Sequence, residues 1–294
     1  MAAMQKNTLK YSAVVFLGGA SYGVMAATIK CALAEGFSWT QTAASQAFFG
    51  ALRFAVALAA LTVLGKRPVP LSPKRVLSLL GLGLATCTTC VLYNFALTML
   101  PVSVAITLLF QFTWMGIVVQ LVVMRRRPRA AEVAAAAVIL GGTLMASGMF
   151  SESVGTLDPV GIACGLLSAV SCTFFMFFSS RVGRGMPSIQ RGLVVCLGAC
   201  ALGFALCPDY FASGVLQNGI WKFGLVLGLC ALFVPVVLFG IATPHLTPGL
   251  AAIMASSELP CGIALSTFVL GEPVEALQVV GIVAILTGIV ISQL

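Results

Sequence analysis

Residues 247–270 read TPGLAAIMASSELPCGIALSTFVL, and Glu258 is the one charged residue in this run. A helix of about 20 apolar residues crosses the hydrocarbon of a bilayer, so the run is long enough to span it. An ionisable side chain inside a bilayer costs at least about 2.5 to 3.5 kcal/mol, and it therefore usually faces protein or a water-filled cavity. The stretch predicts a membrane-spanning helix beside a polar interior.

The whole chain has the same apolar character. Of its 294 residues, 60% are hydrophobic and 8% are charged, and the mean hydropathy is +1.09. Soluble domains carry about 25% charged residues, so this composition excludes a water-soluble fold. The apolar runs predict an all-α integral membrane protein with ten transmembrane helices near 9–31, 41–64, 76–98, 101–124, 130–149, 157–178, 189–206, 220–242, 247–270 and 275–293. A secretory signal in residues 1–31 is disfavoured because further spans follow.

The basic residues predict how the chain is oriented. With the N-terminus inside, thirteen of the sixteen Lys and Arg residues lie at inner helix ends: Lys6, Lys10, Lys66, Arg67, Lys74, Arg75, Arg125, Arg126, Arg127, Arg129, Arg181, Arg184 and Arg191. Cytoplasmic loops carry the excess of Lys and Arg, so the N and C termini are both expected to be cytoplasmic. The basic run 125–129 is interpreted as an anchor to anionic lipid rather than a nucleic-acid site.

An odd number of spans in each half predicts an inverted repeat. Five helices that start inside and end outside leave the next five to run the other way, which gives repeats at 1–149 and 150–294. Sliding Leu100 onto Leu246 without gaps pairs Ala105 with Ala251, Gly116 with Gly262, Ile117 with Ile263 and Gly142 with Gly288. Inverted repeats recur in transporters, with the binding site near the midplane where the halves meet.

Several short motifs resemble those of a known family. They are Leu52-Arg53-Phe54, Tyr93-Asn94-Phe95-Ala96-Leu97, the re-entry at Leu100 to Ala105, and Ser257-Glu258-Leu259-Pro260 followed by Leu270-Gly271-Glu272-Pro273. Together they resemble the EamA-like ten-helix branch of the drug/metabolite transporter superfamily over essentially the whole chain. The first repeat departs from that pattern, with Gln111-Phe112-Thr113-Trp114 where a Pro often sits and Met124-Arg125-Arg126 where Gly-Glu is usual. The resemblance implies a central cavity, alternately open to each side, that moves small organic solutes.

Glu258 is the strongest candidate for a substrate site. It lies about eleven residues into its predicted helix, roughly 17 Å at 1.5 Å per residue, which is near mid-bilayer. Pro260 has no N–H and would leave the Ser256 carbonyl without its helical partner, so a kink with a free polar acceptor is expected there. The carboxylate is interpreted as a site for a substrate amine or a proton, and the alternative is a structural hydrogen bond or ion pair.

Arg53 is the other charge placed well inside a span. A guanidinium stays charged, so it needs an acceptor such as a carboxylate, helix-end carbonyls or the membrane surface. A structural tie between helices is favoured over capture of a substrate carboxylate, and a pair with Glu258 is a further option.

Polar and aromatic side chains in other spans complete the candidate cavity. They are Ser21, Tyr22, Tyr93, Asn94, Gln111, Trp114, Ser171, Phe175, Phe239 and Ser257, with a second kink at Pro235. For each, the alternative is ordinary packing or hydrogen bonding between helices. Aromatic residues near the span ends, namely Tyr11, Trp39, Tyr210 and Trp221, are interpreted as an interfacial belt.

Rival functions have weaker support in the sequence. Gly19-Ala20-Ser21-Tyr22-Gly23 matches the G-x-S-x-G pattern of hydrolases, with His245 as a base, but that elbow needs a strand-to-helix turn and Ser21 lies within a helix. Cys87 and Cys90 form a lone C-x-x-C, so no metal is expected, and no motif indicates a cofactor. A non-transporting receptor or scaffold is a third reading.

The sequence therefore predicts a multi-pass secondary transporter of the inner membrane, without enzymatic activity. Its expected solutes are amino acids or related metabolites, exported by alternating access. The alternative solutes are cationic drugs or nucleoside- and sugar-type metabolites. Its expected partners are the solute and membrane lipid, with protons as a candidate coupling ion, in a monomer or homodimer.

Overall fold

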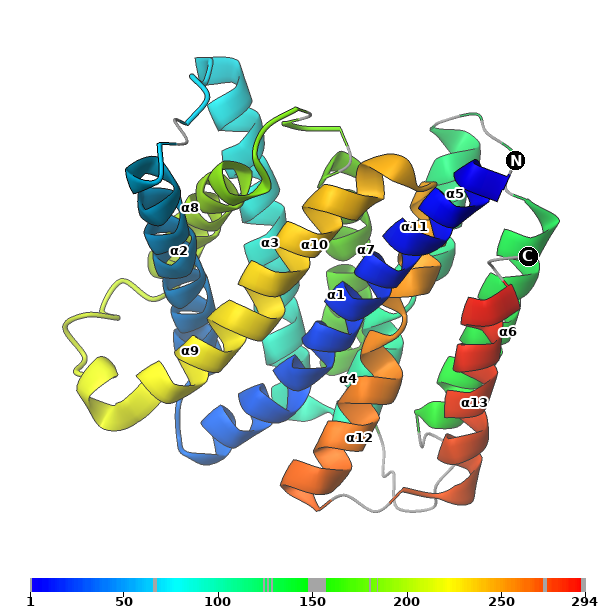
Figure 1. Ribbon diagram of the computed structural model, residues 1–294. Helices are drawn as coiled ribbons and strands as arrows, with labels where there is room; N and C mark the ends of the chain where they lie inside the picture. Colours follow the sequence, from blue (N-terminus) through cyan, green and yellow to red (C-terminus); the bar gives the residue numbers. More distant parts are fainter. Residues whose placement is uncertain are drawn as a thin grey trace.

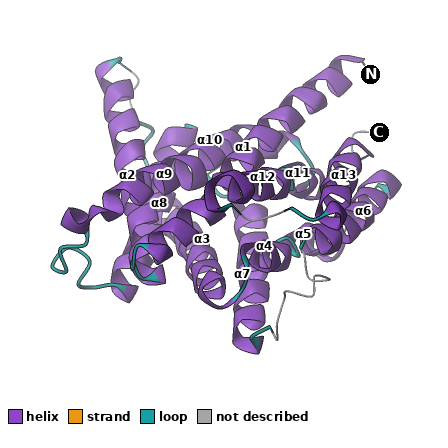
Figure 2. Cartoon of the chain, turned by 90° about the horizontal axis from the view of Figure 1, so that it is seen from below, coloured by secondary structure: helices purple, strands orange, loops and turns teal. Residues whose placement is uncertain are grey.

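The computed structural model describes residues 2–65, 68–123, 125, 127, 129–147, 157–179, 181–183, 185–271 and 274–291. The described residues are almost entirely helical and contain no strand (Figure 2). Residues of the sequence motifs and basic clusters that lie outside this part of the chain are Lys66, Arg67, Met124, Arg126, Arg184, Glu272 and Pro273.

Helices follow every predicted apolar run (Figure 1). In the first half they are α1 (Ala2–Ala34), α2 (Trp39–Val63), α3 (Pro73–Met99), α4 (Val102–Leu109), α5 (Phe112–Val122) and α6 (Ala130–Ala146). In the second half they are α7 (Pro159–Ser179), α8 (Ser188–Leu206), α9 (Trp221–Gly228), α10 (Val234–Ala242), α11 (Pro248–Ala255), α12 (Glu258–Leu270) and α13 (Ala276–Ile291). Short π-helical segments at Leu216–Ile220 and Leu229–Phe233 and a 3₁₀ turn at Thr243–His245 extend α9 and α10.

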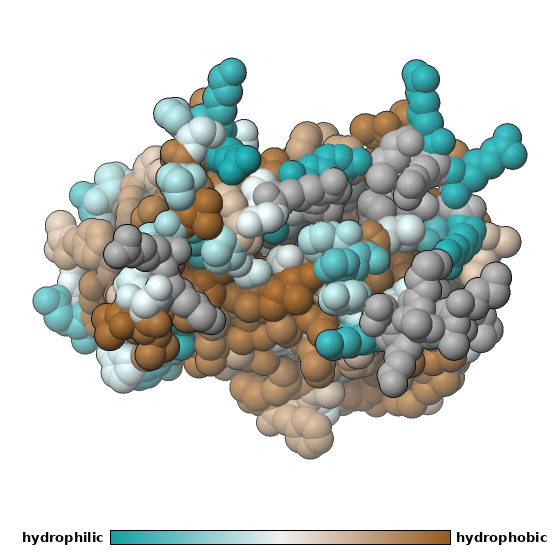
Figure 3. Space-filling view, turned by 45° about the horizontal axis from the view of Figure 1, so that its top comes forward, coloured by the Kyte–Doolittle hydropathy of each residue, from teal (hydrophilic) through white to brown (hydrophobic). Residues whose placement is uncertain are grey.

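The helices have the length and composition of a multi-pass membrane protein. Seven described helical stretches are long and apolar enough to cross a bilayer: Thr8–Ala34, Trp39–Val63, Pro73–Met99, Val102–Val119, Pro159–Ser179, Ser188–Leu206 and Leu216–His245. Three shorter apolar helices are Ala130–Ala146, Ile253–Val269 and Ala276–Ile291. A broad apolar surface lies across the middle of the molecule in Figure 3, and hydrophilic side chains gather along one edge. The all-helical membrane class is confirmed, while the count of ten crossings and the inverted repeat stay predictions.

Two of the predicted spans are each divided by a tight turn. The predicted helix 101–124 is divided at Phe110 and Gln111, and the predicted helix 247–270 at Ser256 and Ser257. In both turns the backbone stays helical but tightens, with i to i+3 hydrogen bonds from Gln111 N–H to Leu108 (3.2 Å) and from Ser256 N–H to Ile253 (3.1 Å). Such tightening is how a helix satisfies its backbone groups where the regular pattern stops.

The turn before Pro260 differs from the sequence-based expectation in one respect. Its Ser256 carbonyl was expected to be free, but it accepts the N–H of Leu259 at 3.2 Å. Pro260 lies in the first turn of α12, where a missing N–H breaks no helical bond. The expectation of a free backbone acceptor there was therefore wrong.

Glycines bring several helix pairs into close backbone contact. A Cβ added at Gly83 of α3 would collide with the Val195 carbonyl oxygen of α8, and one at Gly281 of α13 would lie 2.5 Å from the Gly142 carbonyl oxygen of α6. Figure 1 shows α6 and α13 running side by side. Small residues allow helices in membranes to approach this closely, so these glycines define the packing of the bundle.

One member of the predicted aromatic belt is instead part of the core. Tyr210 is fully buried, and its hydroxyl lies 2.7 Å from the Ser45 hydroxyl of α2. It packs with Phe48, Phe204 and Phe211. Because proximity to a span end does not say whether a loop folds back over its helices, the interfacial interpretation of Tyr210 was wrong.

Candidate functional site

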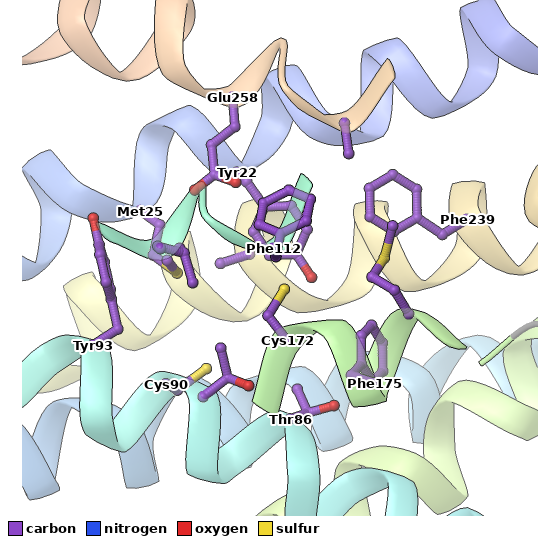
Figure 4. A pocket seen from close by; sticks show the side chains of 15 residues that line it. Tyr22, Met25, Thr86, Cys90, Tyr93, Phe112, Cys172, Phe175, Phe239 and Glu258 are labelled. Carbon is purple, nitrogen blue, oxygen red and sulfur yellow. The ribbon is translucent and has the colours of Figure 1, made fainter. Parts of the chain in front are cut away.

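A mostly apolar cavity lies between helices of both halves (Figure 4). It is lined by Tyr22, Met25, Thr86, Thr89, Cys90, Tyr93, Leu109, Phe112, Cys172, Phe175, Met176, Ala231, Phe239, Ala255 and Glu258. Its volume of about 50 Å³, counted as room for the centres of water-sized molecules, would hold a few waters. Aromatic rings, thioethers and thiols make up most of the wall, and Glu258 is the one charged side chain among the lining residues.

Glu258 is placed by the tight turn that divides its span. It is the first residue of α12, directly after the N-cap Ser257, and only 7% of its surface is exposed. The positive end of a helix dipole stabilises a carboxylate at this position. In Figure 4 the side chain extends from α12 toward Tyr22. Within the described residues its carboxylate has neither a hydrogen-bond donor nor a basic partner, so it is available to a bound solute or proton.

Four other predicted site residues also line this cavity. Tyr22 and Phe239 pack together with ring centroids 5.9 Å apart and the ring planes tilted by 43°. Tyr93 is fully buried, and its hydroxyl has no hydrogen-bond partner within the described residues. Phe175 contributes from α7. A buried hydroxyl without a partner is costly, so the Tyr93 hydroxyl is a second polar group that a bound solute could satisfy.

The remaining polar candidates lie outside the cavity lining, and most are occupied by backbone carbonyls. Ser257 donates to Phe16 (2.7 Å), Ser171 to Ala85 (2.8 Å), Asn94 to Trp39 (3.3 Å) and Gln111 to Thr107 (3.2 Å). Trp114 donates its ring N–H to the Gln111 side chain at 2.9 Å and is 39% exposed. Each fits the alternative of ordinary hydrogen bonding within or between helices.

Ser21 stabilises the irregular helix that carries Pro235. Its hydroxyl donates to the Cys230 carbonyl at 2.7 Å, inside the π-helical segment Leu229–Phe233 that immediately precedes α10. Pro235 has no N–H to offer a preceding carbonyl, so the helix deforms there. The Ser21 hydroxyl therefore supplies a donor from α1.

Arg53 joins two helices. Its guanidinium donates to the Leu225 carbonyl of α9 at 2.6 Å, and the residue is absent from the cavity lining. This contact fits the interpretation that Arg53 links two helices. Arg53 does not line the cavity beside Glu258.

Several lining residues were not predicted as part of the cavity from the sequence. Thr86, Thr89 and Cys90 precede Tyr93 on α3 at helical spacing, so they share a face with it. They could have been predicted by following the helix face that carries Tyr93 toward the start of α3. Gln46, which is buried, donates to the Cys90 sulfur at 3.4 Å and supports this wall from α2.

The residues of the rival hydrolase hypothesis have separate partners. Ser21 is held by Cys230, whereas the His245 ring stacks on Tyr11 with centroids 4.1 Å apart. Gly19 and Gly23, which flank Ser21, lie against the backbone of Ala255 and Cys261 in the second half. The small residues of this motif therefore serve close helix packing. Among the described residues no group of three or more His, Cys, Asp or Glu side chains could hold a metal ion.

Comparison with known proteins finds a family match for the second half of the chain. Residues 159–294 match the family model of the EamA-like transporter family. No curated protein matches the chain. Among solved structures, a crystal structure of a protein shares 18% sequence identity, with a TM-score of 0.71 over 95% of this chain and 98% of that one; at this identity the likeness shows the fold alone. The match to the EamA-like transporter family confirms, over residues 159–294, the resemblance predicted from the sequence.

Proposed function

We propose that this chain is a secondary transporter that moves small organic solutes carrying an amine or another cationic nitrogen. The observation that carries the proposal is the buried Glu258 carboxylate, which faces an aromatic cavity without a basic partner among the described residues. A buried charge without a partner is expensive, so the site is best suited to a cation or a proton. The family match supports a transporter of small solutes.

The wall of the cavity also suits a cationic group. Rings of Tyr22, Tyr93, Phe112, Phe175 and Phe239 line it. An ammonium group over an aromatic face gains about 0.5 to 2 kcal/mol from the ring quadrupole, and more when water is excluded. An aromatic cage with one carboxylate thus offers both interactions that an organic cation needs.

The same wall has little to offer a carboxylate. No described Lys, Arg or His lines the cavity. At the start of α5, the N–H groups of Gln111, Thr113 and Met115 already bond to Leu108, Phe110 and Gln111. An amino acid would therefore bury its carboxylate without a cationic partner among the described lining residues. This favours amines and cationic drugs over the amino acids expected from the sequence, which stay the second candidate.

Alternating access about this cavity is supported by matching helix bounds in the two halves. α4 and α11 begin at Val102 and Pro248, α5 and α12 at Phe112 and Glu258, and α6 and α13 at Ala130 and Ala276, each 146 positions apart. This offset is the one that pairs Leu100 with Leu246. It supports two inverted five-helix repeats that rock about the cavity.

The basic residues also support an orientation of the chain in the membrane. In Figure 1, α1 and α3 both begin toward the top of the view, α3 with Lys74 and Arg75 in its first turn, and α13 runs upward in the same direction as it ends. The positive-inside rule assigns this side to the cytoplasm. We place the protein in the inner membrane as an exporter, with a proton exchanged at Glu258 for the outgoing cation.

The proposal is tested with solutes that differ by one carboxylate. Purified protein would be melted in the presence of phenylalanine, of phenethylamine, which lacks its carboxylate, and of a quaternary ammonium ion. Selective stabilisation reports binding to the folded state, at about 2.7 kcal/mol when the ligand stands at 100 times its Kd. We expect the amine and the quaternary ion to raise the melting temperature and phenylalanine to do so weakly. Flux of the binding solute would then be measured in proteoliposomes with a pH gradient.

Each outcome decides between the candidates. Equal or stronger stabilisation by phenylalanine would favour the amino acid reading. Binding without flux would indicate a receptor. Stabilisation by the amines that survives Glu258→Gln would show that the carboxylate is structural.

A further inference from the structure

A second concave surface lies on the outside of the bundle, between α3 and α7. This groove has a volume of about 640 Å³. Its floor includes Ser78, Gly81 and Ala85 of α3, and its walls include Leu167, Phe174 and Phe178 of α7. Leu167, Phe174 and Phe178 are 54%, 53% and 44% exposed. Because both helices are candidate membrane spans, the groove faces the lipid.

The groove follows the helix axis for the length of an acyl chain. The lining residues of α3 run from Ser78 to Leu92, which is roughly 21 Å at 1.5 Å per residue. Half of the hydrocarbon core is about 15 Å thick. A chain that entered at the end of the groove nearest the start of α3 would therefore lie in it for its whole length.

Polar atoms in the groove are already satisfied. The hydroxyls of Ser78, Thr88 and Ser171 donate to the carbonyls of Lys74 (2.9 Å), Leu84 (2.9 Å) and Ala85 (2.8 Å). Each of these hydroxyl protons is used within the bundle, so the groove offers its occupant mainly hydrocarbon contacts.

Positive charge gathers at one end of the groove. Lys74 lies one helical turn before Ser78 on the same face of α3, and both Lys74 and Arg75 are exposed. Arg181 follows Phe178 at the adjacent end of α7, with its guanidinium 3.6 Å from the ring centroid of Phe177. Residues 70–92 and 159–191 contain no Asp or Glu. The cationic end is therefore unopposed by acidic residues of the two helices.

We propose that the groove between α3 and α7 is a binding site for one anionic phospholipid of the cytoplasmic leaflet, with an acyl chain along Gly81 and Ala85 and the phosphate at Lys74 and Arg75. An apolar trough that ends at the exposed cations Lys74 and Arg75 is complementary to such a lipid in both its acyl chain and its headgroup. The site is separate from the Glu258 cavity and needs only the membrane location of the chain.

A large side chain at position 81 would fill the groove without disturbing the packing of the helices. It is exposed on α3, and a Cβ added there meets no atom within 4 Å. Gly81→Phe would therefore occupy the groove without a clash in the bundle. Gly141 of α6 has the same open surroundings far along the chain, so Gly141→Phe is the matched control.

The test counts lipid bound to purified protein by native mass spectrometry. Delipidated protein would be titrated with phosphatidylglycerol and with phosphatidylcholine of the same acyl chains. We expect one phosphatidylglycerol per chain, bound more tightly than phosphatidylcholine. A cation near a membrane surface contributes about 1 kcal/mol, so Lys74→Gln with Arg75→Gln should weaken phosphatidylglycerol binding about 25-fold. Gly81→Phe should abolish binding of that one lipid, and Gly141→Phe should leave it unchanged.

Other results would overturn the proposal. Equal binding of the two lipids would exclude recognition of the headgroup. Competition by inorganic phosphate alone, with Gly81→Phe unchanged, would show a surface anion site without an acyl chain. A dimer that excludes lipid and dissociates with Gly81→Phe would show that a second copy covers the groove. If Gly81→Phe lowers the melting temperature, the charge variant still decides, because Lys74 and Arg75 are exposed and their loss leaves the packing intact.

Discussion

The two turns that divide a span, at residues 110–111 and 256–257, have the same backbone but different chemistry. Phe110 and Ser256 share φ near −63° with ψ of −10° and −8°, and Gln111 and Ser257 share φ of −57° with ψ of −17° and −18°. The next residue is Phe112 in the first half and Glu258 in the second, and both line the cavity. The backbone is thus repeated, whereas the carboxylate belongs to one half alone.

Pro260 is not the cause of the tight turn that precedes it. The residue 146 positions earlier is Trp114, which has an N–H. Since the first half makes the same turn without a proline, Pro260 is not needed to produce it. Both turns instead precede a helix that begins at the cavity, so the conformation follows from where the two half-helices meet.

The largest effect is expected from removing the Glu258 carboxylate, which has no counterpart in the first half. Glu258→Gln should weaken amine binding about 10- to 150-fold, the contribution of a charge-assisted hydrogen bond, and should abolish flux driven by a pH gradient. Phe112→Leu, at the matching position, should change affinity far less and keep the pH-driven flux. Both are read from amine-induced stabilisation and proteoliposome flux. Equal losses in the two variants would mean that the halves contribute alike.

Matching glycines should respond alike if the halves are true repeats. A Cβ at Gly142 would lie 2.8 Å from the Gly281 carbonyl oxygen, and one at Gly288 would lie 2.7 Å from Ile139. Gly142→Ala and Gly288→Ala should each destabilise the α6–α13 pair by about 1 to 3 kcal/mol through overpacking. Gly141→Ala, in open space, should be neutral or up to about 1 kcal/mol more stable. Thermal unfolding in detergent measures all three, and a loss confined to one of the matched glycines would break the symmetry.

The first turns of α6 and α13 differ in the hydrogen bonds of one side chain each, and a smaller effect is expected there. Glu132 accepts the Arg129 N–H (3.2 Å) and the Thr247 hydroxyl of α11's N-cap (2.7 Å), so it links the two halves. Gln278, 146 positions later, accepts the Glu275 N–H at 2.9 Å and donates to Ala146 at 3.3 Å. Glu132→Ala should cost about 1.5 to 3 kcal/mol and Gln278→Ala about 0.5 to 1.5 kcal/mol, because hydrogen bonds to a charged group are stronger. Unfolding midpoints that rank them the other way would contradict this.

The smallest effect is expected at Pro260. Because Trp114 occupies the matching position, Pro260→Ala should keep the turn, shift stability by less than about 1 kcal/mol, and leave amine affinity unchanged. A large loss of affinity would show that the proline, and not the meeting of the half-helices, positions Glu258.

Parts of the candidate site were predictable because burial of polarity in lipid is costly. Glu258 was predicted as a charge deep in an apolar run and Tyr93 as an aromatic hydroxyl near the end of one, and both line the cavity. Ser257 and Ser21 were also predicted to line it but donate to Phe16 and Cys230. A hydroxyl in a membrane helix takes the nearest free carbonyl, and a single sequence does not reveal whether that carbonyl lies on a neighbouring helix or whether the hydroxyl faces open space.

The sequence by itself determined that the chain folds in lipid and that it folds as helices. Apolar runs of about 20 residues must be satisfied in lipid by their own backbone hydrogen bonds, and helices do this locally. Only the tertiary structure decided which face of each helix meets the cavity and which glycines touch. It also separated Arg53, held on Leu225, from the Glu258 carboxylate. The reason is that helix rotation and crossing are set by packing between segments distant in the chain, and hydrophobicity inside a membrane does not distinguish one helix face from another.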